Sequence, residues 1–260
     1  MKLWRFVREV ATASYYRNRP LEAARLAYAK WLFSRRRVNS PGEFLQRLDV
    51  DPASALAGLE RWRGLLEQTV ASVQREPGQH GAISMQDGVI LFGLVRLEKP
   101  DTVVETGLAA GVSTAFLLAG LIENGGGALY SIELPADRAG EGAHADGARF
   151  DWPRRGAGWA IPEAIRNSRL AAHHRIEGDV RTALPALLAR LPGLDLFFHD
   201  DLHTPPHMLW EYETVWPKLR PNGWLVSDDS NFGWIRFCRN HGLDGRAYVN
   251  LDRLTAARKS

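Results

Sequence analysis

Thr102-Val-Val-Glu-Thr-Gly-Leu-Ala-Ala-Gly-Val-Ser-Thr-Ala-Phe-Leu-Leu-Ala-Gly-Leu121 is the stretch of sequence that decides the fold. Its β-branched start, residues 102–104, predicts a buried strand that ends at Glu105. Residues 107–111 form a glycine-rich turn, and the apolar spacing that follows has the 3.6-residue period of a helix. Strand, turn and helix make the first half of a βαβ unit, so we expect a doubly wound α/β fold.

The glycine-rich turn is also the candidate ligand site. Glycines let the backbone pass close to a ligand, and the next helix begins with unsatisfied N–H groups and a partial positive charge. A dinucleotide fold uses G-x-G-x-x-G, but the position of its second glycine is Ala109 here. The G-x-x-x-G pattern from Gly107 to Gly111 favours a nucleoside without phosphates, and the alternative is a tight turn with no ligand.

Length and composition predict one large α/β domain with an appended helical segment. We divide the 260 residues into a helical extension, 1–75, and a main domain, 76–260. The single Cys238 can form neither an intramolecular disulfide nor a cysteine metal site. We find no run long enough to cross a bilayer and no secretory signal, so we expect a cytoplasmic protein.

Charge is unevenly distributed along the chain. Residues 1–40 carry ten Lys or Arg against two Glu, a net +8, which leaves about −5 for the remainder of a chain whose net charge is +3. This distribution does not indicate a nucleic-acid-binding domain. Three roles are open for the basic, aromatic-rich residues 1–40. They could contact an anionic membrane, which would make the protein membrane-peripheral, or they could pack on the domain or form a homodimer interface.

Further strands and helices alternate after the central stretch. We expect a mostly parallel, seven-stranded sheet closed by a C-terminal antiparallel hairpin. The expected strands are 102–105, 128–133, 173–177, 194–199 and 224–226, with the hairpin from 247–249 and 254–256. The polar segment 138–160 is too long for an ordinary connection, so we interpret it as an insertion that is either a lid over the site or a surface loop.

Two acidic residues follow the second and third strands. Glu133 ends the second strand, 26 residues after Gly107 (133 − 107 = 26), where a carboxylate accepts hydrogen bonds from both ribose hydroxyls. Asp179, in Gly178-Asp179-Val180, follows the third strand. It is a candidate contact of an adenine amino group, or else it caps the next helix.

Three further carboxylates follow the fourth and fifth strands. Asp200 comes directly after one strand, and Asp228 and Asp229 come directly after the other. In open α/β sheets this edge carries the site. Neighbouring buried carboxylates are costly unless a cation neutralises them, and oxygen ligands suit Mg²⁺. The alternative is that these residues cap a helix and lie in a solvated turn.

His203 is the candidate general base. It lies three residues after Asp200, and its ordinary pKa of about 6.5 leaves imidazole largely neutral at pH 7. His199, inside the fourth strand, is interpreted as structural. Direct metal binding by both histidines is a further alternative.

These motifs, in this order, resemble those of class I S-adenosylmethionine-dependent methyltransferases. The resemblance covers about residues 80–258 and is closest to small-molecule O-methyltransferases of the catechol type and to the group found beside sugar and polysaccharide genes. Val104 to Ser113 matches the first motif, Ser131-Ile-Glu133 the ribose motif, and Gly178-Asp179-Val180 the adenine segment. Two departures stand out: Asp229 replaces an asparagine ligand of the catechol enzymes, and His203 replaces their catalytic lysine.

The resemblance implies that S-adenosyl-L-methionine binds to Glu105, Gly107, Gly111, Ser113, Glu133, Gly178, Asp179, Val180 and Asp200. It implies Mg²⁺ or another divalent cation on Asp200, Asp228 and Asp229, with Asp200 and His203 as catalytic residues. The expected reaction is methyl transfer to a hydroxyl of a small molecule or glycan. The alternatives are metal-independent methyl transfer, an NAD-linked oxidoreductase, and a non-catalytic scaffold bound to a membrane or a partner.

Overall fold

The computed structural model describes residues 19–76, 82–134 and 155–260. Its centre is one twisted sheet of strands β1 (Thr102–Thr106), β2 (Ala128–Glu133), β3 (Ala172–Glu177), β4 (Leu194–His199), β5 (Leu219–Ser227) and β6 (Thr255–Arg258). The order is β3-β2-β1-β4-β5-β6, and all neighbours are parallel except β5 and β6. The strand order reverses between β1 and β4, which is where open α/β sheets bind ligands.

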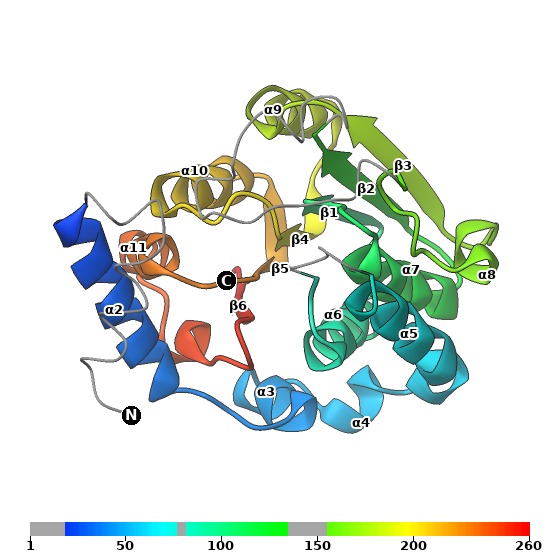
Figure 1. Ribbon diagram of the computed structural model, residues 1–260, viewed down its shortest axis with the longest axis horizontal. Coiled ribbons are helices and arrows are strands. Elements are labelled where there is room, and N and C mark those ends of the chain that lie inside the picture. Colours follow the sequence, from blue (N-terminus) through cyan, green and yellow to red (C-terminus); the bar gives the residue numbers. More distant parts are fainter. Residues whose placement is uncertain (1–18, 77–81, 135–154) are drawn as a thin grey trace.

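Helices cover both faces of the sheet, as Figure 1 shows. One face carries α3 (Pro41–Arg47), α4 (Pro52–Ala55), α5 (Leu59–Gln74), α6 (Met85–Glu98) and α7 (Val112–Asn124). The other carries α2 (Pro20–Ser34), α9 (Val180–Arg190), α10 (Pro205–Val215) and α11 (Phe232–Asn240). The remaining elements are short: α8 (Glu163–Arg166) and a 3₁₀ turn, η2 (Gly245–Tyr248).

Strand alternation divides the buried side chains between two cores. Val103 and Phe198 point into the core beneath α6 and α7, whereas their neighbours Val104 and Phe197 point into the core beneath α9 and α10. Successive side chains of a strand lie on opposite faces, so a fully apolar run is buried on both sides. The doubly wound α/β fold predicted from the sequence is confirmed.

The expected strand number was wrong. The described residues form six strands rather than seven, with one antiparallel pair at the C-terminal side. Residues 247–249 do not pair with 254–256, because η2 takes up Gly245–Tyr248 and the Trp234 indole N–H donates to the carbonyl of Ala247 at 2.7 Å. Residues 255–258 extend the sheet beside β5 instead.

The predicted helical extension contains described helices from α2 to α5. Phe44, Leu45 and Leu66 belong to the same buried cluster as α6 and α7, so this part of the chain packs directly on the main domain. The boundary at residue 75 stays a prediction. Residues 1–18 and most of the 138–160 insertion, including Trp152, lie outside the described residues.

Every helix of the described residues is too short or too polar to cross a lipid bilayer.

Among the described glycines, Gly107 has the least room for a side chain. Its φ is +86°, and a Cβ there would lie 2.0 Å from the carbonyl oxygen of Asp200. We expect Gly107→Ala to lower the free energy of unfolding by more than the cost of left-handed backbone alone, about 1–2 kcal/mol. Urea unfolding measures this loss.

Gly125 provides the matched control. Its φ is +81°, and a Cβ there would meet nothing within 4 Å. Gly125→Ala therefore reports the backbone cost without the clash. Equal losses in the two variants would contradict the close contact between the turn and β4.

Candidate active site

The glycine-rich turn follows β1 and packs against the backbone just after β4. Gly111 begins α7 with a φ of +92°, and a Cβ on it would lie 2.5 Å from Ile161 Cγ1. The backbone of 158–160 also packs on the turn, because Gly158 N and Ala160 N donate to the carbonyls of Ala109 and Ala110 at 2.7 and 2.9 Å. The described end of the predicted insertion therefore covers one side of the turn.

Glu105 orders this turn from inside the protein. Its fully buried carboxylate accepts hydrogen bonds from Ser113 Oγ at 3.2 Å, Thr114 Oγ1 at 2.6 Å and Ser131 Oγ at 2.6 Å. Burial raises the pKa of Glu105, and the three hydroxyls oppose that rise. Glu105 and Ser113 thus bind each other, and their direct contact with a cofactor stays a prediction.

Glu133 lies at the same turn, 8% exposed at the end of β2. Its Oε2 accepts from the backbone N–H of Ala109 at 2.6 Å, and its Oε1 accepts from that of Leu134 at 2.9 Å. Burial raises the pKa of Glu133 to about 7, against the hydrogen bond from Ala109. The structure therefore places the predicted ribose carboxylate beside the predicted cofactor turn.

The segment after β3 lies next to Glu133. The backbone N–H of Gly178 donates to the carbonyl of Glu133 at 2.9 Å, and Val180 is buried. Asp179 caps α9, because its Oδ1 accepts from Arg181 N at 2.8 Å. The helix-capping alternative is thus the role that the structure shows, and the adenine contact stays a prediction.

An acidic cluster lies where β4 and β5 end. One ligand atom each from Asp200, His203 and Asp228 lies within 4.8 Å of the other two. His203 is held between Asp200 Oδ1, 3.5 Å from its Nε2, and Asp229 Oδ2, 3.1 Å from its Nδ1. The three aspartates singled out in the sequence therefore meet at one sheet edge.

Asp228 is the residue whose environment is incomplete. Its side chain is 0% exposed, and neither carboxylate oxygen has a hydrogen-bond partner. Burial raises its pKa, the nearby Asp229 raises it further, and Arg253, 3.6 Å away, opposes both. A buried carboxylate without hydrogen bonds is costly, so this group fits a cation that would complete it.

Charge in the cluster also acts on its other members. Burial raises the pKa of Asp200 well above its ordinary value, and Asp228 adds to the rise. Burial lowers the pKa of His203, but Asp200 and Asp229 outweigh it and hold that pKa well above the ordinary value. The neighbouring carboxylates therefore favour the protonated form of His203, and its role as a general base stays a prediction.

Two members of this site were missed from sequence. Asp87, 1% exposed near the start of α6, has an Oδ1 without a partner, and burial together with Asp228 raises its pKa to about 7. Arg253 precedes β6 and pairs with Asp229 Oδ2 at 3.0 Å. The S-x-x-D capping box of Ser84 and Asp87 was a visible signal, whereas nothing local marked Arg253.

A second buried network lies behind the first. Glu211 on α10 accepts from Thr106 Oγ1 at 2.9 Å and is paired with His199 Nδ1 at 2.7 Å and His207 Nε2 at 3.1 Å. Burial raises the pKa of Glu211, but the two histidines outweigh it and lower the pKa to about 2. The structural role predicted for His199 is in accord with these contacts. The sequence signal for the network is His207 and Glu211 at i, i+4 on one helix.

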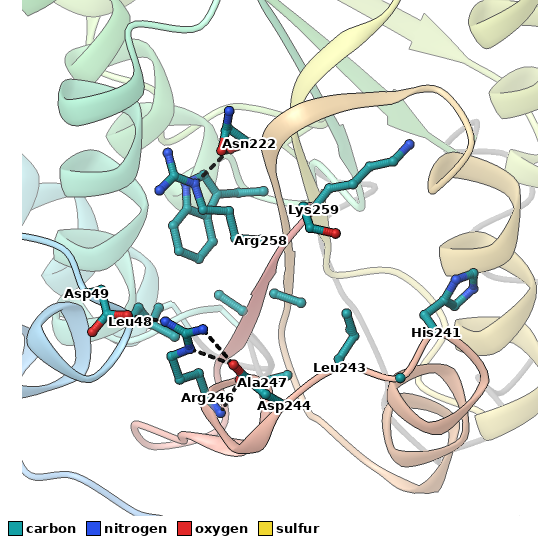
Figure 2. A pocket seen from close by; sticks show the side chains of 15 residues that line it. Leu48, Asp49, Asn222, His241, Leu243, Asp244, Arg246, Ala247, Arg258 and Lys259 are labelled. Atoms are coloured by element: carbon teal, nitrogen blue, oxygen red, sulfur yellow. Dashed lines mark hydrogen bonds and ion pairs between the residues drawn. The ribbon is translucent and has the colours of Figure 1, made fainter.

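A separate cavity of about 420 Å³ lies away from this site (Figure 2). Its lining residue Asn222 belongs to the first half of β5, whereas Asp228 follows the other end of that strand. Arg246 pairs with Asp49 and Asp244, and the Arg258 Nε donates to the carbonyl of Asn222 at 3.1 Å. Because these charges are paired within the protein, the acidic cluster remains the stronger candidate for the active site.

The site lies within a segment that is similar to a known family. A family model described as a methyltransferase domain matches residues 104–230, which run from β1 to just past Asp229. This match supports the prediction of a class I S-adenosylmethionine-dependent methyltransferase, and the fold is in accord with it. The comparison with curated proteins finds no match.

Solved structures share the fold of this methyltransferase domain. A Klebsiella pneumoniae protein assigned to the O-methyltransferases is 20% identical, with a TM-score of 0.52 over 75% of this chain and 90% of that one. An SAH-bound Podospora anserina methyltransferase is 18% identical, with a TM-score of 0.49. That match covers 64% of this chain and 62% of the Podospora chain, so this chain spans less than two thirds of that protein.

His207 gives a test of the second network by pH. Burial lowers the pKa of His207, but Asp201 and Glu211 outweigh the effect of burial and raise this pKa to about 9. Because the pKa of His207 is higher in the folded protein than in the unfolded chain, protonation of His207 stabilises the fold. This stabilisation is complete below the pKa in the unfolded chain, about 6.5, and is lost as the pH rises through about 9. We expect the stability difference between the wild type and His207→Gln to shrink by about 2–3 kcal/mol from pH 6 to above pH 9.

Urea unfolding at the two pH values measures this difference. The control is His241→Gln, because His241 forms a surface pair with Glu213 at 2.8 Å and should change stability little at either pH. A difference for His207→Gln that is the same at both pH values would contradict the buried network.

Proposed function

We propose that this methyltransferase moves the methyl group of S-adenosylmethionine to a hydroxyl oxygen of a small molecule or glycan, with a divalent cation at the acidic cluster. The observation that carries the proposal is Asp228, a buried carboxylate beside Asp200 whose two oxygens accept no hydrogen bond. Gly107 packs on Asp200, so the cofactor turn and the acidic cluster share one sheet edge.

The cofactor residues are proposed from their positions around that edge. The Gly107–Gly111 turn and Ser113 would hold the methionine part, and Glu133 would accept from the ribose hydroxyls. Gly178, Asp179 and Val180 would border the adenine. Because Glu133 now accepts from Ala109 N, we infer that this carboxylate couples ribose binding to the position of the turn.

Asp200 and Asp228 would hold the cation, with Asp229 as the third candidate ligand. The chemistry it would supply is orientation and acidification of the acceptor hydroxyl. Oxygen-rich ligation favours Mg²⁺ or a similar hard ion. Arg253 and His203 already offset part of the negative charge, and Asp229 is engaged with both of them.

His203 is the proposed base. The acceptor oxygen forms a bond to the methyl carbon as the carbon–sulfur bond breaks, and the hydroxyl proton passes to His203. Because Asp200 and Asp229 raise the pKa of His203, its neutral form requires positive charge elsewhere in the cluster. The surrounding aspartates would then stabilise the imidazolium that proton transfer creates.

Metal-independent transfer is the second candidate. The observation that favours it is His203 itself, whose ring nitrogens face Asp200 and Asp229 at 3.5 and 3.1 Å. In that case the aspartates position the acceptor or the cofactor directly. For both candidates we propose a cytoplasmic location.

Asp228→Asn separates the two candidates. Removing a carboxylate whose pKa is raised by burial should increase the unfolding temperature in EDTA, because the variant no longer buries a carboxylate that lacks hydrogen bonds. Mg²⁺ or Mn²⁺ should stabilise the wild type and not the variant, with the affinity lowered more than about tenfold in calorimetry.

Asp101→Asn is the matched control, since the side chain of Asp101 is 90% exposed. It should leave the unfolding temperature and the cation affinity unchanged. If Asp228→Asn binds the cation as tightly as the wild type, the acidic cluster is not a metal site and metal-independent transfer takes its place.

The cofactor and base assignments are tested together. S-adenosylhomocysteine should raise the unfolding temperature and NAD⁺ should not. His203→Gln should bind S-adenosylhomocysteine normally. With labelled S-adenosylmethionine and a panel of phenols and sugars, its rate of methyl transfer should be lower than that of the wild type by a factor of about 10²–10⁴. His241→Gln should keep both properties. Stabilisation by NAD⁺ alone would overturn the proposed activity.

A further inference from the structure

Helix α2 presents an exposed stripe on its outer side. Leu21, Ala24, Tyr28, Trp31 and Arg35 follow one another at steps of three and four residues, and all five are exposed. Residues at this spacing lie on one face of a helix. Among the described residues, four large hydrophobic side chains are exposed, and three of them belong to this stripe: Leu21 at 62%, Tyr28 at 39% and Trp31 at 44%.

The opposite side of α2 is fixed to the domain. Ala29 is 0% and Phe33 4% exposed within the core that α10 and α11 share, and α2 lies beside α11 at one end of the molecule (Figure 1). The helix is therefore held rigidly with its outer stripe facing away from the protein. Burial in the domain accounts for one face of the helix and leaves the other unexplained.

The stripe is ordered by its own contacts. The rings of Tyr28 and Trp31 are stacked with centroids 6.0 Å apart, and the Arg35 guanidinium lies 5.2 Å from the Trp31 ring. Tyrosine, tryptophan and arginine side chains of this kind have an apolar body and a polar end, which is the composition of a membrane–water interface.

Positive charge surrounds the stripe. Arg35, Arg36 and Arg37 are exposed at the end of α2, and Arg236 and Arg239 are exposed on the neighbouring α11. The acidic Glu22 is paired with Arg25 on the same helix. A partner of opposite charge with an apolar layer beneath it would match both features of this surface.

We propose that the outer stripe of α2 docks the protein on an anionic lipid surface. A second copy fits less well, because a two-fold interface brings the same patch of both copies together and would place these arginines against each other. The aliphatic end of the stripe, Leu21 and Ala24, offers a nucleic acid neither a stacking ring nor a hydrogen bond. The 15-residue helix is about 22 Å long, enough to lie flat in the headgroup layer.

Helix α2, which carries the docking surface, and the segment after it contact residues close in sequence to the proposed active site. Arg25 of α2 lies 5.1 Å from the ring of Phe232, three residues after Asp229, and Arg37 pairs with Asp252 at 2.9 Å beside Arg253. A bound membrane would thus lie near the acidic cluster. If the proposed function holds, the acceptor class is then a hydroxyl carried by a membrane amphiphile.

Vesicle co-sedimentation of the full chain tests the docking. We expect binding to phosphatidylcholine vesicles that contain about 30% phosphatidylglycerol, weak binding to pure phosphatidylcholine, and release by high salt. The double variant Tyr28→Ala/Trp31→Ala should bind these vesicles more weakly, because it loses the apolar contribution to binding. Arg35→Glu should weaken partitioning by about fivefold or more, the effect of one basic side chain at an anionic surface.

Two substitutions elsewhere on the surface are matched controls. Leu170 is 55% exposed on the loop before β3, and Arg190 is exposed at the end of α9. Leu170→Ala and Arg190→Glu should partition as the wild type does, and unchanged unfolding temperatures establish that all variants are folded. Because vesicle binding needs no turnover, its result is independent of the methyl-transfer assays.

Two results would overturn the docking proposal. The first is equal vesicle binding by the wild type and the double variant, or equal binding to neutral and anionic vesicles. The second is a wild-type dimer in size-exclusion chromatography that Tyr28→Ala/Trp31→Ala dissociates, with no vesicle binding, which would assign the stripe to a second copy instead.

Discussion

The contact between the Gly107 backbone and the carbonyl of Asp200 holds the candidate site together. It brings the turn after β1 against the end of β4 at a distance that excludes any side chain at residue 107. Glu211 reinforces the same junction from behind, because it binds Thr106 at the end of β1 and His199 at the end of β4. The cofactor turn and the acidic cluster are therefore fixed relative to each other by packing, before any ligand is bound.

Electrostatics at this edge favours ligand binding at a cost to the fold. Asp87 and Asp228 are buried carboxyl groups with unpartnered oxygens, and burial raises the pKa of each. Arg253 and His203 supply positive charge, but they are shared among several aspartates. A site that keeps uncompensated negative charge buried gives up stability, and a cation or a hydrogen-bonding acceptor would recover it.

The helices before the sheet have two roles in the structure. The inner faces of α3 and α5 belong to the core beneath α6 and α7, and the inner face of α2 belongs to the opposite core. Their packing explains the buried apolar residues of the predicted extension. It does not explain the exposed aromatic and basic stripe on the outer side of α2.

The sequence by itself determined the βαβ order, the strand ends and the acidic residues that follow them. Those features depend on local periodicity and on residues adjacent in the chain, as at Glu105 to Gly107 and at His199 to Asp200. Only the tertiary structure decided that β6 joins β5 alone, that Arg253 faces the aspartates, and that His203 lies between two of them. These outcomes depend on residues that are distant in the sequence. The Trp234 indole N–H donates a hydrogen bond to the carbonyl of Ala247, and Arg253 lies 24 residues after Asp229. Periodicity gives the face on which a side chain lies, but the charge that surrounds it, and hence its pKa, is set by whichever elements pack against that face.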